Sequence, residues 1–116
     1  MKSHMKLNDL EKHEKNTFGG LVRMMLRADE SFTEAEEARV NEIGEELGGA
    51  DLVWRVISDS AQAFPTDEQI RASAKAVTRP EARALILDVV SRISASDGVD
   101  PNERALESWL EREWSR

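Results

Sequence analysis

The chain has 116 residues, of which 40% are hydrophobic and 34% are charged, and its formal net charge at pH 7 is -7. This length suits one hydrophobic core and leaves no room for a second core of useful size. The negative charge would repel a nucleic-acid backbone or an anionic lipid surface, so we expect no nucleic-acid partner. Cysteine is absent, which excludes disulfides, thiolate nucleophiles and cysteine-ligated zinc sites and fits a reducing compartment.

We expect neither a membrane-spanning segment nor an export signal in this sequence. No run approaches the roughly 20 consecutive apolar residues that cross a bilayer, and the start lacks the apolar stretch of a signal peptide. The sequence therefore predicts a cytoplasmic protein. Residues 1–5 are typical of an expression-vector remnant, and residues 6–16 are predicted to form an N-terminal arm or frayed helix. The expected folded domain covers residues 17–116.

Helical periodicity and capping signals mark two helices in the first half of that domain. The first follows a cap at Asn16 or Thr17, because apolar residues then recur at helical spacing. The second begins at Thr33, whose side chain is expected to form a capping box with Glu36. It ends at the glycine pair 48–49, which suits a left-handed C-terminal cap.

Four further helices are expected in the second half. Asp51 is the predicted cap of the third helix, which stops at Phe64. A fourth begins at Thr66, with Gln69 at the capping-box position. The fifth has Thr78 and Glu81 as its expected capping box, and it should be central because it is the most apolar. The sixth is expected to start at Asp100, with Pro101 at its first position and Glu103 at its third. The positions expected to face the core in the third, fifth and sixth helices are Val53, Val56, Ile57, Ala61, Leu85, Ile86, Val89, Val90, Ile93, Leu106, Trp109, Leu110 and Trp114.

No stretch alternates apolar and polar residues with a period of two, so no strand is expected. The sequence predicts an all-α fold, a helical bundle of five to six helices built on a duplicated helix-turn-helix unit. The two copies span residues 21–47 and 85–114. In each copy an apolar helix ends in an aspartate, and the next helix has a glutamate at its third position. The matched carboxylates are Asp29, Glu36, Asp97 and Glu103.

The second copy contains the run Ser96-Asp97-Gly98-Val99-Asp100-Pro101-Asn102-Glu103 behind an apolar helix. This run resembles the Asp-Gly…Glu signature of the TerB-like (tellurite-resistance) family. The likeness extends from about residue 18 to the end, although the first copy has Glu30 where glycine is usual. Membership would imply an all-helical bacterial protein linked to tellurite resistance, chemical stress and phage defence, with metal-binding acidic residues and no known catalytic activity.

The matched carboxylates also suggest a site on physical grounds. Asp29 and Asp97 fall on the inward stripes of their helices, at helix ends where the macrodipole disfavours negative charge. A divalent cation of the calcium or magnesium type, a basic side chain or turn amides would each compensate. A purely structural interpretation stays open, because Glu36 and Glu103 also fit capping boxes and the second aspartate fits a turn.

The sequence thus predicts a non-enzymatic stress-response binding domain able to hold a divalent metal between its helices, with Asp29, Glu36, Asp97 and Glu103 as ligands, and to engage a partner protein. The alternative is a metal-free protein-interaction or adaptor domain of the co-chaperone-associated type. An acid-catalysed hydrolase is disfavoured because no polar substrate cleft can be argued. His13 lies in a charged arm and is expected to be solvated.

Overall fold

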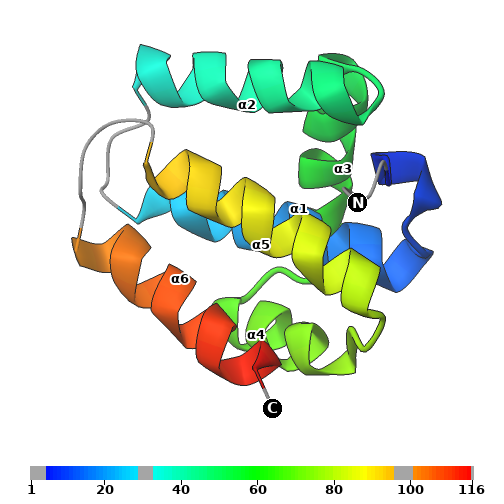
Figure 1. Cartoon of the computed structure of the whole chain (residues 1–116), viewed down its shortest axis with the longest axis vertical. Coiled ribbons are helices and arrows are strands. Elements are labelled where there is room, and N and C mark those ends of the chain that lie inside the picture. Colours follow the sequence, from blue (N-terminus) through cyan, green and yellow to red (C-terminus); the bar gives the residue numbers. More distant parts are fainter. Residues whose placement is uncertain (1–4, 29–32, 96–100, 116) are drawn as a thin grey trace.

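The computed structural model describes residues 5–28, 33–95 and 101–115. Within these ranges it contains helices and no strand, so the prediction of an all-α bundle is confirmed. In Figure 1, α5 crosses the middle of the view, with α2 on one side and α4 and α6 on the other. The elements are η1 (Leu7–Asp9), α1 (Lys12–Arg27), α2 (Glu34–Leu47), α3 (Ala50–Ala63), α4 (Asp67–Ala76), α5 (Pro80–Ser94) and α6 (Pro101–Trp114).

The first α-helix begins earlier than the sequence predicted. Its N-cap is Glu11, so the expected cap at Asn16 or Thr17 is wrong. Thr17 is instead buried inside α1, where its hydroxyl donates to the carbonyl of His13 at 2.9 Å. The helix extends back through the arm because buried leucines of the arm, Leu7 and Leu10, anchor it to the core.

The glycine pair 19–20 lies inside α1 and marks a close approach of three helices. A Cβ added at Gly19 would lie 2.6 Å from the carbonyl oxygen of Val56 on α3, and one added at Gly20 would lie 2.8 Å from Ile70 Cγ1 on α4. The glycines therefore allow α1 to pack tightly on α3 and α4. Since α1 also contacts α5, the centre of the bundle belongs to α1 and α5 together, rather than to α5 alone.

Several local predictions hold because they depend on neighbouring residues only. Thr33 caps α2 and forms the expected capping box with Glu36, and Thr66 does the same for α4 with Gln69. The glycine pair 48–49 ends α2 with positive φ angles of 124° and 135°. Left-handed backbone of this kind favours glycine over residues with a side chain.

Two predicted caps are wrong. The N-cap of α3 is Gly49 and not Asp51, which lies in the first turn. The N-cap of α5 is Arg79, and the helix lacks the predicted box between Thr78 and Glu81. Pro80 begins the helix at a position where a missing amide costs nothing. The Arg79 side chain instead donates a hydrogen bond to Glu14 at the start of α1, a long-range contact that local signals do not reveal.

The core agrees with the helical stripes except at their margins. Ile86, Val89 and Ile93 of α5 are buried as predicted. Ala61 is exposed, and Leu85 and Trp109 are only partly buried, which corrects the expectation that all three face the core. Trp114 anchors the end of α6, because its Nε1–H donates to the carbonyl of Ala74 on α4 at 2.8 Å. None of the helices in the described parts of the chain is long and apolar enough to cross a membrane.

Candidate functional site

Two of the four predicted site residues, Glu36 and Glu103, lie in the described part of the chain. Each is the third residue of its helix, Glu36 in α2 and Glu103 in α6. Their side chains are almost fully buried, with exposures of 1% and 2%. A carboxylate in the first turn of a helix is favoured by the macrodipole, but that interaction does not require burial. The other two predicted residues, Asp29 and Asp97, lie outside the described residues.

The capping box supplies hydrogen bonds to one carboxylate oxygen of Glu36 and none to the other. Glu36 Oε1 accepts hydrogen bonds from the backbone amide of Thr33 at 3.1 Å and from its hydroxyl at 3.3 Å. The amide of Glu36 donates to Thr33 Oγ1 at 3.1 Å. Glu36 Oε2 is buried and accepts no hydrogen bond within the described chain. An unpartnered buried carboxylate oxygen is costly, so this atom requires compensation that the capping box does not supply.

The two helix-turn-helix units meet at the end of the molecule that contains these glutamates. The side-chain amide of Asn102, beside Glu103 in α6, donates to the carbonyl of Ala28 at the end of α1, at 2.9 Å. The start of α2, the ends of α1 and α5 and the start of α6 lie on the same side of the molecule in Figure 1. The sequence could not establish this arrangement, because the two units are far apart along the chain.

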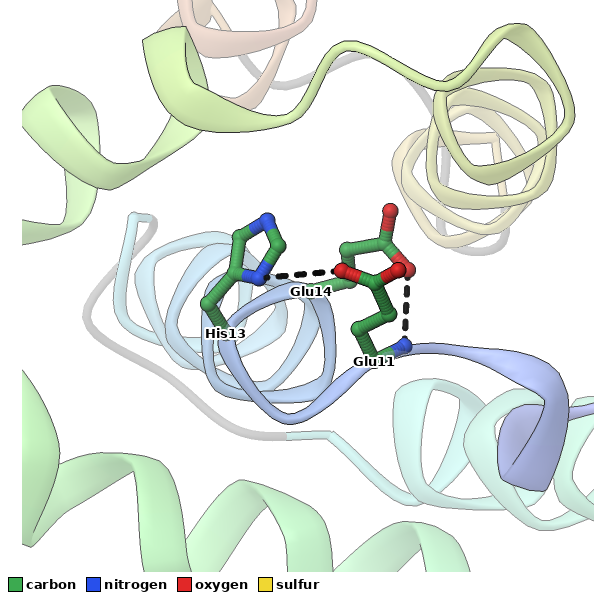
Figure 2. A group of neighbouring side chains, drawn as sticks. All are labelled: Glu11, His13 and Glu14. Atoms are coloured by element: carbon green, nitrogen blue, oxygen red, sulfur yellow. Dashed lines mark hydrogen bonds and ion pairs between the residues drawn. The ribbon is translucent and has the colours of Figure 1, made fainter.

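A second group of possible metal ligands lies at the start of α1. Glu11, His13 and Glu14 have ligand atoms within 4.8 Å of one another (Figure 2). His13 is exposed, in agreement with the predicted solvated side chain, and its Nδ1 lies 3.6 Å from Glu11 Oε1. Glu14, however, is already engaged. Its Oε1 accepts from the Glu11 amide at 2.7 Å, and its two oxygens accept from Arg79 Nη2 at 2.5 Å and Arg79 Nε at 2.9 Å.

The contact between Glu14 and Arg79 is a structural ion pair. The hydrogen bond from the Arg79 guanidinium lowers the pKa of Glu14, and this effect exceeds the opposing effect of burial. The same contact raises the pKa of Arg79. Arg79 also donates to the carbonyl of Asp9, at 3.0 Å, so one side chain fastens both η1 and the start of α1 to α5. A metal at this place would have to displace the guanidinium, which makes the group a poor metal centre.

Sequence reasoning missed the ion pair almost entirely. The only local signal is the spacing of Glu11 and Glu14, which fits a capping box at the start of a helix. Nothing in the sequence around Arg79 indicates a partner in the N-terminal arm. Long-range pairs of this kind depend on tertiary packing and carry no periodic signature.

Comparisons with protein-family models, with curated proteins and with solved structures found no match for this chain. The class of this protein therefore follows from its fold and site alone. It is an all-α domain of six α-helices within the described residues, with buried glutamates at the starts of α2 and α6. The TerB-like resemblance remains a hypothesis that rests on the motif between Ser96 and Glu103.

Proposed function

We propose that this domain is a non-enzymatic, TerB-like binding module that holds a divalent cation at an acidic site between its two helical hairpins and engages a partner protein. The observation that supports the proposal is the buried Oε2 atom of Glu36, which accepts no hydrogen bond within the described residues. Carboxylate oxygens are the ligands that calcium and magnesium prefer. The absence of cysteine supports a reducing compartment such as the cytoplasm as the site of action.

The charges at this end of the bundle favour a cation. The carboxylates of Glu36 and Glu103 carry a formal charge of -2 together. Each helix N-terminus offsets part of this charge, by roughly +0.5. Asp29 and Asp97, which the sequence predicts to join the site, would add further negative charge. Glu36, Glu103 and the two aspartates would hold the ion, which would neutralise buried charge and link the two hairpins.

Thermal unfolding with added cations tests the proposal. After chelation, the melting temperature should rise with the concentration of calcium or magnesium, because an ion that binds only the folded state stabilises it. At a concentration one hundred times the Kd, the gain is about 2.7 kcal/mol, which corresponds to about 10 °C for a domain of this size. Manganese and zinc complete the series and distinguish hard-cation selectivity from general metal binding.

A matched pair of variants assigns the effect to the site. Glu36→Gln should abolish the cation-dependent shift, because it removes the charge and keeps the shape. Glu37→Gln is the control, since Glu37 is exposed on the same helix and the substitution makes the same change in charge. A flat response of the wild type to all four metals would contradict the proposal, as would an equal response of the two variants.

The second candidate function is a metal-free protein-interaction domain. It is supported by a groove beside α5 in which Leu85 is partly exposed. In that case no metal changes the melting temperature, and Glu36→Gln has little effect because glutamine also forms capping boxes. The same titration therefore separates the two candidates.

A further inference from the structure

The arm before α1 is attached to the bundle by two kinds of contact. Leu7 and Leu10 are 0% and 4% exposed and belong to the hydrophobic core. The Arg79 guanidinium of α5 donates to the carbonyl of Asp9 at 3.0 Å. The other side chains within residues 6–10 are exposed. The bundle therefore holds the arm at two leucine side chains and one backbone carbonyl.

Two backbone amides of the arm donate within the arm itself. The amide of Asp9 donates to the carbonyl of Lys6 at 2.9 Å, and the amide of Leu10 donates to the carbonyl of Leu7 at 3.1 Å. These bonds belong to η1, a 3-10 helix of three residues. A helix this short does not persist once it leaves the bundle. Exchange of these two amides with solvent therefore reports detachment of the arm.

The start of α1 is complete without the arm. The amide of its N-cap, Glu11, donates to Glu14 Oε1 at 2.7 Å (Figure 2). The two carboxylate oxygens of Glu14 accept from Arg79, at 2.5 and 2.9 Å. Neither contact involves residues 6–10. Detachment of the arm would leave a capped helix, and an arginine still held where it can receive the Asp9 carbonyl again.

We propose that residues 6–10 form a strap that opens and closes as one unit on this preformed site, while the six α-helices stay folded. Closing the strap buries two leucines and forms the bond to Arg79. Opening it restores the conformational freedom of a chain end. These opposing terms are small beside the burial that holds α1 in the core from Thr17 to Val22. The strap therefore opens at a lower free energy than the whole bundle unfolds.

Opening of the strap changes the surface of the bundle at one place. It uncovers the apolar surface beneath Leu7 and Leu10, and it takes Lys6 out of the wall of the groove beside α5. The strap thus controls how much apolar surface the bundle exposes there. In Figure 1, η1 lies on the opposite side of the molecule from the starts of α2 and α6. The strap is therefore separate from the proposed cation site, and either proposal can fail without the other.

Native-state hydrogen exchange of the full chain at low urea concentrations tests the proposal. The amides of Asp9 and Leu10 should share one protection factor, at least about a hundredfold below those of Val22 in α1 and Val90 in α5. Their exchange should also depend less on urea, because opening exposes less surface than unfolding does. The amide of Glu11 should be at least about tenfold better protected than that of Leu10, because its bond inside α1 survives opening.

Two matched core variants test whether the strap is independent of the bundle. Leu7 and Ile93 are 0% and 1% exposed, and Leu7→Val and Ile93→Val each remove one methylene group. Opening and unfolding both expose Leu7, so Leu7→Val should speed exchange of the Leu10 and Val22 amides by the same factor, about fivefold. Ile93 stays buried when the strap opens. Ile93→Val should therefore speed exchange at Val22 about fivefold and change it at Leu10 by less than about twofold.

A second matched pair tests the role of Arg79. Lysine keeps a positive charge for Glu14 but lacks the planar fork that reaches Glu14 and the Asp9 carbonyl together. Arg79→Lys should therefore speed exchange of the Leu10 amide about tenfold. Arg92→Lys is the control, because it is the same substitution on α5 at an arginine bonded to α2. It should change exchange at Leu10 by less than about twofold.

Three outcomes would overturn the proposal. If the strap and core amides share one protection factor and one urea dependence, the strap has no opening of its own. If protection rises gradually from Asp9 through Glu11 without a step after Leu10, the chain end frays residue by residue. If the Leu10 amide responds equally to Leu7→Val and Ile93→Val, or equally to the two lysine variants, the strap is not a separate unit held by Arg79.

Discussion

Glu14 and Glu36 occupy the same local position in different helices and differ in what surrounds them. Each is the third residue of its helix, completes a capping box and has a side chain that is 1% exposed. Glu14 receives two hydrogen bonds from Arg79, whereas Oε2 of Glu36 receives none within the described residues. The capping box therefore explains why a glutamate stands at both places, and only the second oxygen distinguishes a structural ion pair from a candidate binding site.

A carboxylate introduced into the core without any compensating partner gives the largest expected effect on stability. Val89→Asp would place a charge in the core with neither a capping box nor a cation, since Val89 is 3% exposed in the middle of α5. The cost should reach about 5 kcal/mol or more, which is comparable to the stability of a whole small domain. We expect the variant to lack cooperative unfolding by circular dichroism, with Val89→Ala as a folded control. A soluble, cooperatively melting Val89→Asp protein would show that the core is not as described.

Glutamine at the two matched positions should change stability in opposite directions in the presence of a chelator. Glu14→Gln keeps the capping box but loses the charge-assisted bonds to Arg79, and should destabilise by about 2 kcal/mol. Glu36→Gln removes a buried charge that has no cation, and should be neutral or stabilising by up to about 1 kcal/mol. Urea unfolding of both variants measures the difference. Equal destabilisation would mean that the two sites are electrostatically alike.

Acid should weaken the domain partly through Glu14. Its pKa is lowered from the ordinary value of 4.5 in the folded state, chiefly by the hydrogen bond from Arg79. Stability from this pair is therefore fully present above pH 4.5 and is lost as the pH falls through the lower folded-state pKa. Unfolding free energies of the wild type should fall more steeply below pH 4.5 than those of Glu14→Gln. If the unfolding free energies of the two proteins change with pH in parallel, Glu14 is not a source of acid sensitivity.

The smallest expected effect concerns the link between the two hairpins. Asn102→Ala removes the hydrogen bond from its side chain to the carbonyl of Ala28 and should cost about 1 kcal/mol. If the cation bridges the hairpins, the same variant should also reduce the cation-dependent rise in melting temperature, because the two halves of the site are less well positioned. Asn8→Ala, at an exposed position near the other end of the chain, is the control. If the cation-dependent rise in melting temperature is unchanged in Asn102→Ala, the ion does not bridge the two hairpins.

Leu85 shows where the apolar stripe of a helix gives a wrong prediction of burial. Leu85 has helical spacing with Val89 and precedes the buried Ile86, so periodicity assigns it to the core. The buried arc of α5 is narrower than the apolar stripe, because the helix contacts α1, α2 and α6 and leaves Leu85 at the edge. Hydrophobicity predicts which side chains favour burial, but the neighbouring helices determine which of them are covered.

The sequence by itself determined the all-α class, the positions of most helices, the capping boxes at Thr33 and Thr66 and the glycine pair that ends α2. These features depend on residues three or four positions apart, so local chemistry is sufficient to specify them. It also singled out Glu36, Glu103, Asp29 and Asp97 as metal ligands, and this assignment stays a prediction.

Tertiary structure alone decided the burial of the two glutamates, the meeting of the two hairpins and the ion pair between Glu14 and Arg79, which are 65 residues apart. It also decided that the glycine pair 19–20 continues a helix, because close packing on α3 and α4 outweighs the low helix propensity of glycine. Contacts between distant residues leave no periodic trace in the chain, so only the folded arrangement reveals which charges are compensated by a partner among the described residues.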